Sequence, residues 1–448
     1  MSAIPVTVVS GFSAVGRNSL VVHLLKARSE LSFAVIMIEE DEAIAESNEF
    51  DDELAAATGS TAASLMEQID RLLPQGIIRC TSRDELMEEI SNLNETEECD
   101  FLIILASSLS EPMSIAETMA WIESAESDTD SDTPSGPHLD TLVTVIDSAT
   151  FLDDFLSMDS IEERFPSIED DRDLSQLLAE QIECANVIVL NDRRPADSGG
   201  ESESEEMGFL QEFLSHLNPE SRVLTACCGV VDPDEVLGTE SFSGSLADIS
   251  DAGESLAAES DAVDVELTES ESTCSQLRTT QPSASGVTRM EYRACRPFHP
   301  QRFYDFWVEN QFPGTILRSK GCFWLATRME SAGLWSQAGS VINAMGAGTW
   351  WADTPEEQWP DEEMLPREEL FADWDEQWGD RRQDLVIIGQ ELEPSIFQAA
   401  LDACLLTDDE MQASPDDWQQ LPDPFASWDD DDLHSGHDHD CSRDHDHD

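Results

Sequence analysis

Hydrophobic and polar residues in the first half of the chain follow the pattern of a sheet that is covered on both faces. Short, nearly continuous apolar runs recur at residues 6–9, 33–38, 100–105, 142–146 and 187–190. Runs of this length predict parallel strands whose two faces are both buried. Stretches with helical spacing separate the runs, which is typical of βαβ units. We therefore expect an α/β domain with a mostly parallel sheet and helices on both faces.

A loop bounded by two glycines joins the first apolar run to a helix-spaced stretch. Gly11 and Gly16 keep the spacing of the phosphate-binding motif G-x-x-x-x-G-K-[ST], and strand, loop and helix follow in the order that this motif requires. Such a loop holds phosphate with backbone N–H groups and a helix amino terminus, neither of which needs particular side chains. We expect a nucleotide site here. The alternative is a tight β–α turn of any doubly wound fold.

The side-chain half of this motif has changed. Arg17 stands at the position of the lysine and Asn18 at that of the magnesium-binding hydroxyl, while Ser19 comes one position late. Arginine can supply charge to phosphate, although its planar fork differs from the compact head of lysine. The Asn18 carbonyl oxygen is a hard ligand of the kind that Mg²⁺ accepts. Nucleotide with Mg²⁺ is therefore an expectation that the sequence leaves open.

Polar residues follow other predicted strands of the same domain. Residues 107–112 follow the third apolar run, and Asp147 and Asn191 follow the last two. In a parallel sheet the ligand lies at the carboxyl ends of the strands. We expect these residues to gather beside the loop that begins at Gly11.

The chain changes character after residue 231, where we end the first domain. Residues 232–286 are rich in Ser, Asp, Glu and Gly, which predicts an acidic, largely disordered linker. Order returns at residues 287–406, a smaller α+β domain with an acidic, tryptophan-bearing insertion at 350–379. Its predicted elements are strands at 288–292, 321–326 and 385–388 and helices at 300–311 and 394–405.

Residues 407–448 form a charged tail with candidate metal ligands near its end. These ligands are His434, His437, His439, Cys441, His445 and His447. Histidine-rich tracts indicate metal binding, and imidazole with a thiol suits Zn²⁺, Cu²⁺, Ni²⁺ or Co²⁺. The alternative is a solvated tail without a ligand. The adjacent pair Cys227 and Cys228 is expected to form core thiols, because neighbouring strand residues point to opposite faces.

The charge of the chain indicates the solvent to which the protein is adapted rather than the activity that it has. Lys+Arg number 23 against 96 Asp+Glu, a net charge of −73, and Lys26 and Lys320 are the only lysines. Such a surface repels itself in dilute buffer, and salt screens that repulsion. We infer adaptation to a salt-rich cytoplasm rather than a disordered acidic protein, because apolar strands and aromatic residues run through most of the length. No basic stripe favours nucleic acid. The chain contains no apolar run of about 18 residues, so we expect no membrane span. We expect the cysteines to be reduced, which is the default in the cytoplasm.

Four strings in the second half carry a resemblance to a known family. They run from residue 293 to 302, 318 to 326, 334 to 339 and 380 to 389. With the glycine-bounded loop, they make the chain resemble the CobW family of P-loop GTPases, whose members act as zinc or cobalt metallochaperones. The resemblance implies GTP with Mg²⁺ as cofactor, zinc or another divalent transition metal as cargo, and a client metalloprotein as partner.

The chain departs from the family at most functional positions of the first domain. Family members have lysine and threonine at Arg17 and Asn18, a glutamate at Leu105, a glycine at Ser108, and a guanine-reading Asn-Lys-x-Asp where this chain continues from Asn191 to Arg194. Their Cys-x-Cys-Cys site ends at Cys80, whereas Ile77 and Arg79 replace its first two cysteines here. The positions that persist are Arg83, Asp100, Asp147 and Asn191, and Asp100 is a candidate for magnesium or switch contacts.

Three hypotheses follow. The first is a CobW-type metal-handling protein whose GTPase activity is weak or lost and whose tail captures zinc. The second is a non-catalytic scaffold or regulatory partner of an intact paralogue. The third is a divergent, active GTPase metallochaperone in which Arg17 and Asn18 substitute for the usual pair. The sequence leaves a homo-oligomer open and names neither the metal nor the client.

Overall fold

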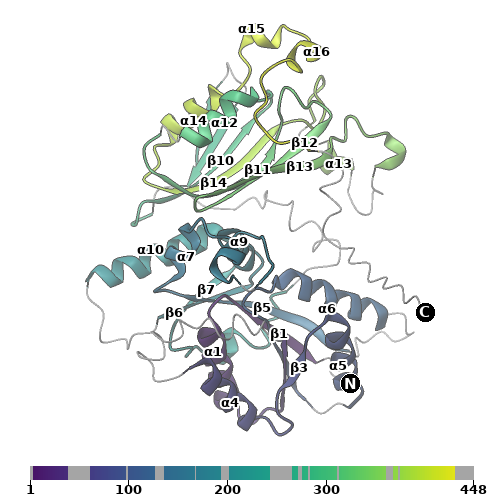
Figure 1. Ribbon diagram of the computed structural model, residues 1–448, viewed down its shortest axis with the longest axis vertical. Coiled ribbons are helices and arrows are strands. Elements are labelled where there is room, and N and C mark those ends of the chain that lie inside the picture. Colours follow the sequence, from purple (N-terminus) through teal and green to yellow (C-terminus); the bar gives the residue numbers. More distant parts are fainter. Residues whose placement is uncertain are drawn as a thin grey trace, which may run out of the picture.

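The computed structural model describes twelve stretches of the chain with defined placement. These are residues 4–38, 61–96, 99–126, 136–166, 168–192, 201–242, 265–270, 275–280, 283–309, 312–359, 367–371 and 374–428. The candidate ligands of the tail, from His434 to His447, lie outside the described residues, as do Arg193 and Arg194. Figure 1 shows two sheets, one above the other, with helices of the first domain between them.

The first domain contains a seven-stranded sheet with the order β3-β2-β4-β1-β5-β6-β7. Every pairing in it is parallel, which confirms the predicted fold class. The strands are β1 (Pro5–Ser10), β2 (Phe33–Ile38), β3 (Ile78–Cys80), β4 (Phe101–Leu105), β5 (His138–Asp147), β6 (Val187–Asp192) and β7 (Arg222–Cys227). The continuous apolar runs of the sequence are the central strands, buried on both faces.

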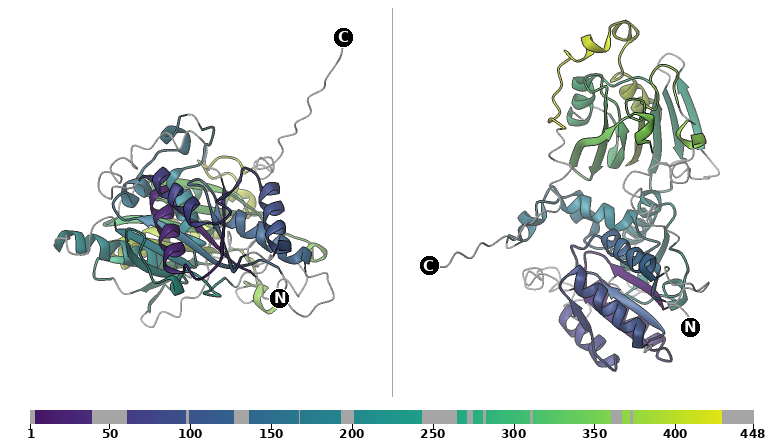
Figure 2. Two further views of the ribbon diagram at one scale, coloured as in Figure 1. Left: turned by 90° about the horizontal axis from the view of Figure 1, so that it is seen from below. Right: turned by 90° about the vertical axis from the view of Figure 1, so that its right-hand side faces the viewer.

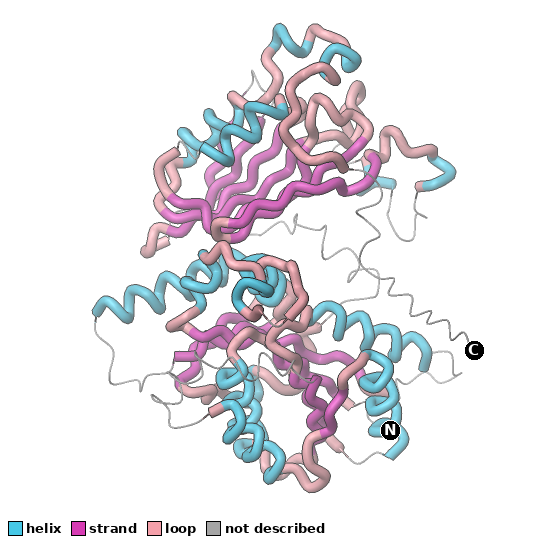
Figure 3. The backbone as a smooth tube through the Cα atoms, in the orientation of Figure 1, coloured by secondary structure: helices cyan, strands magenta, loops and turns pink. Residues whose placement is uncertain are grey.

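Helices cover both faces of this sheet, as Figure 3 shows. They are α1 (Ala14–Ala27), α4 (Ala62–Leu72), α5 (Arg83–Thr96), α6 (Pro112–Glu126), α7 (Phe151–Leu156), α8 (Ile161–Arg164), α9 (Leu174–Glu183) and α10 (Glu201–Leu217), followed by the short η1 (Pro233–Glu235). Residues of α1 and α4 pack on one face, and residues of α5 and α6 on the other.

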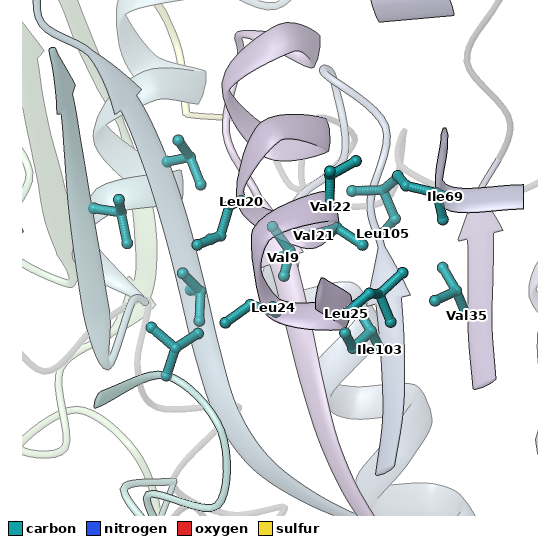
Figure 4. Packing of buried hydrophobic residues seen from close by; sticks show 14 of the residues in the cluster. Val9, Leu20, Val21, Val22, Leu24, Leu25, Val35, Ile69, Ile103 and Leu105 are labelled. Atoms are coloured by element: carbon teal, nitrogen blue, oxygen red, sulfur yellow. The ribbon is translucent and has the colours of Figure 1, made fainter. Parts of the chain in front are cut away.

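Helix α1 shows how the sheet holds the glycine-bounded loop in place. Leu20 and Leu24 are fully buried and belong to the same cluster as Val9 and Val145 of the sheet. Figure 4 shows these leucines pointing from α1 toward the strands. Because burying a leucine side chain contributes about 2 kcal/mol, this face fixes the start of α1 against the ends of β1 and β5.

The second domain contains an antiparallel sheet with the order β13-β12-β11-β14-β10-β9-β8. Its strands are β8 (Val265–Ser270), β9 (Ser275–Thr280), β10 (Val287–Ala294), β11 (Thr315–Phe323), β12 (Ser331–Ala338), β13 (Val341–Thr349) and β14 (Gln383–Gln390). Its helices are α12 (Pro300–Glu309), η2 (Glu356–Gln358), α13 (Arg367–Leu370), α14 (Pro394–Asp402), α15 (Asp408–Met411) and α16 (Pro415–Trp418). An aromatic core lies between the sheet and α12 and α14, as the predicted α+β domain requires.

The predicted linker of residues 232–286 differs from the structure at both ends. Val236 and Leu237 are buried in the first domain's core. Further on, β8 and β9 lie at the edge of the second sheet, and Leu277 of β9 is fully buried opposite Tyr292. Strand β9 escapes sequence analysis because one leucine alternates with serine and threonine, which gives a weak hydrophobic signal. The predicted insertion at 350–379 lies between β13 and β14.

The two domains share a buried interface. Leu174 and Leu178 of α9 belong to one apolar cluster with Leu317 and Ala338 of the second sheet. Helices α7, α9 and α10 lie between the two sheets in Figure 1, and the side view in Figure 2 agrees. Within the described stretches, no helix combines the length and apolar character needed to cross a membrane.

Candidate nucleotide and metal sites

The loop after β1 is held together by its own arginine. Arg17 is buried, and its guanidinium donates to the Gly11 carbonyl oxygen at 2.6 Å and to Ser108 Oγ at 3.1 Å. Ser108 follows β4, so this side chain joins the loops after two neighbouring strands. The sequence correctly predicts that residues 11–19 and 107–112 lie together. It does not predict that Arg17 turns inward.

The amino terminus of α1 differs from the open cradle that the sequence predicts. The helix begins at Ala14, two residues before Gly16. Ser13 is its N-cap: Gly16 N–H donates to Ser13 Oγ at 3.3 Å, and Arg17 N–H donates to Ser13 O at 3.1 Å. Serine is a strong N-cap, which explains the early start. These two N–H groups are engaged within the chain rather than facing a phosphate.

Both glycines of the loop have a packing role that is independent of phosphate. Gly11 has a φ of +125°, and a Cβ there would lie 2.2 Å from the Val145 carbonyl oxygen. A Cβ on Gly16 would lie 3.1 Å from Val145 Cγ1. The loop therefore runs too close to β5 for a side chain at Gly11. This accounts for the glycine spacing in a tight β–α turn as well as in a nucleotide site.

The candidate magnesium ligands do not converge. Asn18 is buried, and its Nδ2 donates to Ala62 O at the start of α4, at 3.3 Å. Asp100 precedes β4, where its carboxylate accepts from Ser32 N–H at 2.8 Å. Because β4 runs parallel to β1, with Val6 opposite Leu102, Asp100 lies at the sheet edge opposite the loop. A separation of about seven strand residues is about 20 Å. The prediction that Asp100 contacts magnesium or a switch is therefore wrong.

Asn191 lies at the predicted edge, at the end of β6. Its Oδ1 accepts from Gly229 N–H at 2.8 Å, in the turn after β7. Gly229 in turn lies against α1, since a Cβ there would be 2.7 Å from Leu20 N. Asn191 thus fixes the turn after β7 beside the loop after β1.

The structure gives a different outcome for each cysteine prediction. Cys80 ends β3 and is buried, and its thiol pKa is raised to about 11 by burial, with Glu89 and Glu85 adding to the effect. Over the described part of the chain, no group of three or more His, Cys, Asp or Glu residues is arranged to hold a metal ion.

Cys227 and Cys228 are not core thiols on opposite faces: Cys228 is exposed, and the two sulfur atoms lie 3.9 Å apart. Cys295 takes part in a disulfide, against the expectation of uniformly reduced cysteines.

Two residues that the sequence did not single out hold the loop after β4. Gln181 of α9 donates from Nε2 to the carbonyl oxygens of Ser108 and Ser110, both at 3.0 Å. Arg172 donates to Leu109 O at 3.2 Å and pairs with Glu111. No motif marks these residues, because their acceptors are backbone atoms far away in sequence.

A small hollow of about 30 Å³ lies beside the loop after β1. It is lined by Phe12 and Ser13 of that loop and by residues of β5, α7 and α9, among them Asp147 and Asp154. Burial raises the pKa of the Asp154 carboxyl to about 6, while Arg164 opposes the shift and Asp153 and Asp147 add to it. Acidic walls raise the negative potential here, which disfavours a phosphate anion in the hollow.

Comparison with known proteins decides the relationship. Residues 5–225 match the family model "CobW/HypB/UreG, nucleotide-binding domain", and residues 287–405 match "Cobalamin synthesis protein cobW C-terminal domain". The chain is 31% identical over 439 residues to "Zinc-regulated GTPase metalloprotein activator 1" of Dictyostelium discoideum, covering 94% of this chain and 84% of that protein. The chain belongs to the CobW family.

Other CobW relatives are more distant. "Zinc chaperone Rv0106" of Mycobacterium tuberculosis is 28% identical over 369 residues, 80% of each chain. Among solved structures, the Zn(II)-bound YjiA GTPase from E. coli is similar at 16% identity, with 91% of this chain and 100% of that chain covered and a TM-score of 0.35. Membership in the CobW family rests on the two family models, one for each domain, and on the Dictyostelium relative.

Proposed function

We propose that this CobW-family chain is a metal-handling protein that carries zinc to a client metalloprotein, and that its GTPase activity is weak or lost. The observation that carries the proposal is the combination of relatedness along 94% of the chain to a zinc-regulated activator with an Arg17 that is bound inside its own loop.

The residues present fit a magnesium nucleotide poorly. Gly11 to Ser19 and Asn191 would be the groups that hold GTP. However, the N–H groups of Gly16 and Arg17 already have acceptors, and Asn18 is bound to Ala62. Phosphoryl transfer depends on a metal ion and on positioned charge for most of its acceleration. A site with asparagine in place of the hydroxyl ligand and with Arg17 turned inward supplies neither.

The chemistry of the tail supports capture of the metal. Five histidines and one cysteine, His434, His437, His439, Cys441, His445 and His447, stand within fourteen residues. Neutral imidazole and thiolate are the ligands that zinc prefers. The acidic residues between them add an attraction for cations that salt weakens.

The test is a calorimetric Zn²⁺ titration of the full chain in molar KCl. We compare the wild type with a variant in which all five tail histidines are replaced by asparagine, and with a matched variant that replaces His138 and His216 of the folded domain. We expect the tail variant to lose zinc sites and the matched variant to keep them. Equal binding by all three would remove the tail from the account.

The shape of the second domain also affects how the tail is removed. Phe425 and Trp428 pack on the aromatic core of the second sheet, and Arg328 lies over the Trp428 ring at 4.1 Å. A truncation before these residues would damage the domain, so a tail deletion must begin after Trp428.

A second candidate function is a scaffold or regulatory partner of an intact paralogue. It is favoured by the departures at Arg17 and Asn18 within a preserved fold. The test is binding of a fluorescent GTP analogue with Mg²⁺. Micromolar binding of the analogue by the wild-type chain would contradict the scaffold. If the analogue does not bind, the zinc titration separates the scaffold from the metal carrier, because only the carrier requires zinc sites in the tail.

A further inference from the structure

The turn after β7 places two thiols side by side. Cys227 ends the strand, and Cys228 and Gly229 follow with φ values of 55° and 77°. Val230 N–H donates back to Cys227 O at 3.2 Å, which closes a four-residue turn. Two central residues with positive φ are typical of a type I′ turn. This turn swings the Cys228 side chain out of the strand alternation and toward that of Cys227.

The distance between the two sulfur atoms distinguishes two kinds of chemistry. Sγ of Cys227 and Sγ of Cys228 lie 3.9 Å apart. A disulfide requires about 2.05 Å. Two thiolates on one tetrahedral zinc ion, each at about 2.3 Å, lie about 3.8 Å apart. The contact is a thiol–thiol hydrogen bond in which Cys227 Sγ donates to Cys228 Sγ. Its spacing equals that of shared metal coordination, so an ion can replace the protons without rearrangement, whereas a disulfide would require the sulfur atoms to move closer.

The surroundings of the pair also suit a passing cation. Cys228 is exposed and Cys227 is partly exposed, and Val230 beside them is 56% exposed. The carboxylate of Asp192 lies close enough to interact with Cys228, and its negative charge attracts a cation.

We propose that Cys227 and Cys228 form a two-thiolate transfer site for a soft or borderline divalent metal ion, zinc included. This inference rests on the proposed metal-handling function. Binding of the ion to both sulfurs forms two metal–sulfur bonds and releases two thiol protons to solvent, with no change of oxidation state. Two ligands leave two positions of a tetrahedral ion open for a ligand of the tail or of a client, whereas structural zinc sites fill all four.

The position of the turn connects this site to the loop after β1. Gly229 N–H donates to Asn191 Oδ1 at 2.8 Å, and a Cβ at Gly229 would lie 2.7 Å from the Ser19 carbonyl carbon. The turn has no room to move without displacing α1 or Asn191. An ion on the two thiols therefore lies next to the segment that holds nucleotide in related domains.

The experiment is a Co²⁺ titration of the reduced, full-length protein in molar KCl, followed by the thiolate-to-cobalt charge-transfer absorption. Histidine and carboxylate ligands do not give this band, so the tail histidines stay silent. All variants carry Cys441→Ser, because a tail thiolate also gives this band. They are Cys227→Ser with Cys228→Ser, each single change, and Cys322→Ser as the matched control for a partly exposed thiol. In a second double variant Cys228→Asn replaces the serine change, because asparagine tolerates positive φ.

We expect both double variants to lose the band, each single variant to show a weaker band because one metal–sulfur bond remains, and Cys322→Ser to keep the full band. An undiminished band in the double variants would overturn the site, provided that thermal unfolding shows them folded. The five-histidine tail variant separates the two proposals. If this variant binds zinc like the wild type, the proposal that the tail captures zinc is contradicted. The proposal for Cys227 and Cys228 is tested separately by the cobalt band.

Discussion

Arg17 illustrates how one side chain changes what a loop can do. Its planar fork reaches two acceptors in different segments, Gly11 O and Ser108 Oγ. Lysine presents a compact ammonium on a flexible stem and has no such fork. The arginine therefore acts as an internal brace of the loop after β1. The sequence shows the exchange of residue type at this position, but the direction of the side chain follows from Ser108, which is 91 residues away.

The glycine at position 11 offers a test of this packing. Gly11→Ala would press a Cβ against the Val145 carbonyl at 2.2 Å in a backbone with a φ of +125°. We expect a loss of about 3 kcal/mol or more in the free energy of unfolding. Gly208→Ala is the matched control, because nothing lies within 4 Å of a Cβ at that position of α10. It should gain about 0.5–1 kcal/mol. Equal effects in urea unfolding would contradict the packing role.

The buried carboxyl of Asp154 predicts a pH dependence. Burial raises its pKa from 3.8 to about 6. The pKa of the Asp154 carboxyl is higher in the folded protein than in the unfolded chain. Its contribution to the free energy of unfolding is therefore fully present below about pH 4 and is lost as the pH rises through 6. Asp154→Asn should remove this loss. The difference in unfolding free energy between the variant and the wild type should therefore shift by about 2–3 kcal/mol in favour of the variant from pH 4 to pH 8.

The control for that prediction is Asp159→Asn. Asp159 lies 3.5 Å from the same Arg164 but is 44% exposed, whereas Asp154 lies 2.8 Å away and is buried. Urea unfolding at several pH values measures both variants. A difference curve for Asp154→Asn that stays flat across pH 6 would show that the carboxyl does not titrate as described.

At the scale of elements, α9 connects the loop after β4 with the second domain. Gln181 holds the carbonyls of Ser108 and Ser110. Two residues later, Glu183 pairs with Arg318 at 2.9 Å and with Lys320 at 2.8 Å, both on β11. Arg17, Ser108, α9 and β11 thus form one continuous chain of polar contacts. Such a chain is the physical basis on which the two domains can respond to one another.

Glu183 is the point at which this connection can be broken. Burial would raise the pKa of its carboxyl, but Arg318 and Lys320 outweigh burial and lower it to about 2. Glu183→Gln leaves two cations without their carboxylate, and the side chain is 16% exposed. We therefore expect a loss of about 2–4 kcal/mol at pH 7, where the charge is fully present in both states.

The matched control lies on the same helix. Glu180 stands at an exposed position of α9. Glu180→Gln should therefore cost little at neutral pH. Limited proteolysis between the domains and thermal unfolding measure both variants. Equal stability of Glu183→Gln and the wild type would show that the Glu183 ion pairs do not hold the two domains together.

How far the sequence predicts these elements depends on the kind of signal. Strands β2, β4 and β6 follow from apolar runs that are buried on both faces, so periodicity finds them. Strand β9 does not, because Leu277 is its only large apolar residue. Gln181 and the turn at Cys228 were missed for another reason: backbone acceptors and a positive φ leave no mark in residue spacing. The gathering of loops at one sheet edge was predictable from topology alone.

At the scale of the whole molecule, charge is the dominant feature. A net charge of −73 must be held in one compact chain. Many of the arginines are in ion pairs, such as Arg302 with Glu410 and Arg328 with Asp423. These pairs are local, and they cannot offset an excess of carboxylates of this size. We therefore infer that the stability of the fold depends on screening by salt.

This dependence predicts the response to salt. Raising KCl from 0.1 M to 1 M shortens the Debye length from about 10 Å to about 3 Å and screens repulsion between surface carboxylates. We expect the thermal midpoint to rise by about 5 °C or more, which corresponds to a few kcal/mol in a chain of this size. Calorimetry in KCl and in an equal osmolarity of sucrose separates screening from exclusion effects. A midpoint that falls with KCl would contradict the interpretation of the charge.

We propose that Arg17 and Asn18 take the phosphate loop out of catalysis while the fold persists. GTP turnover with Mg²⁺ in molar KCl measures it most directly, for the wild type and for the double variant Arg17→Lys with Asn18→Thr. We predict background turnover by the wild type and a gain of about tenfold or more in the double variant, because the lysine and hydroxyl supply charge and metal binding. Brisk turnover by the wild type, unchanged in the double variant, would contradict the claim.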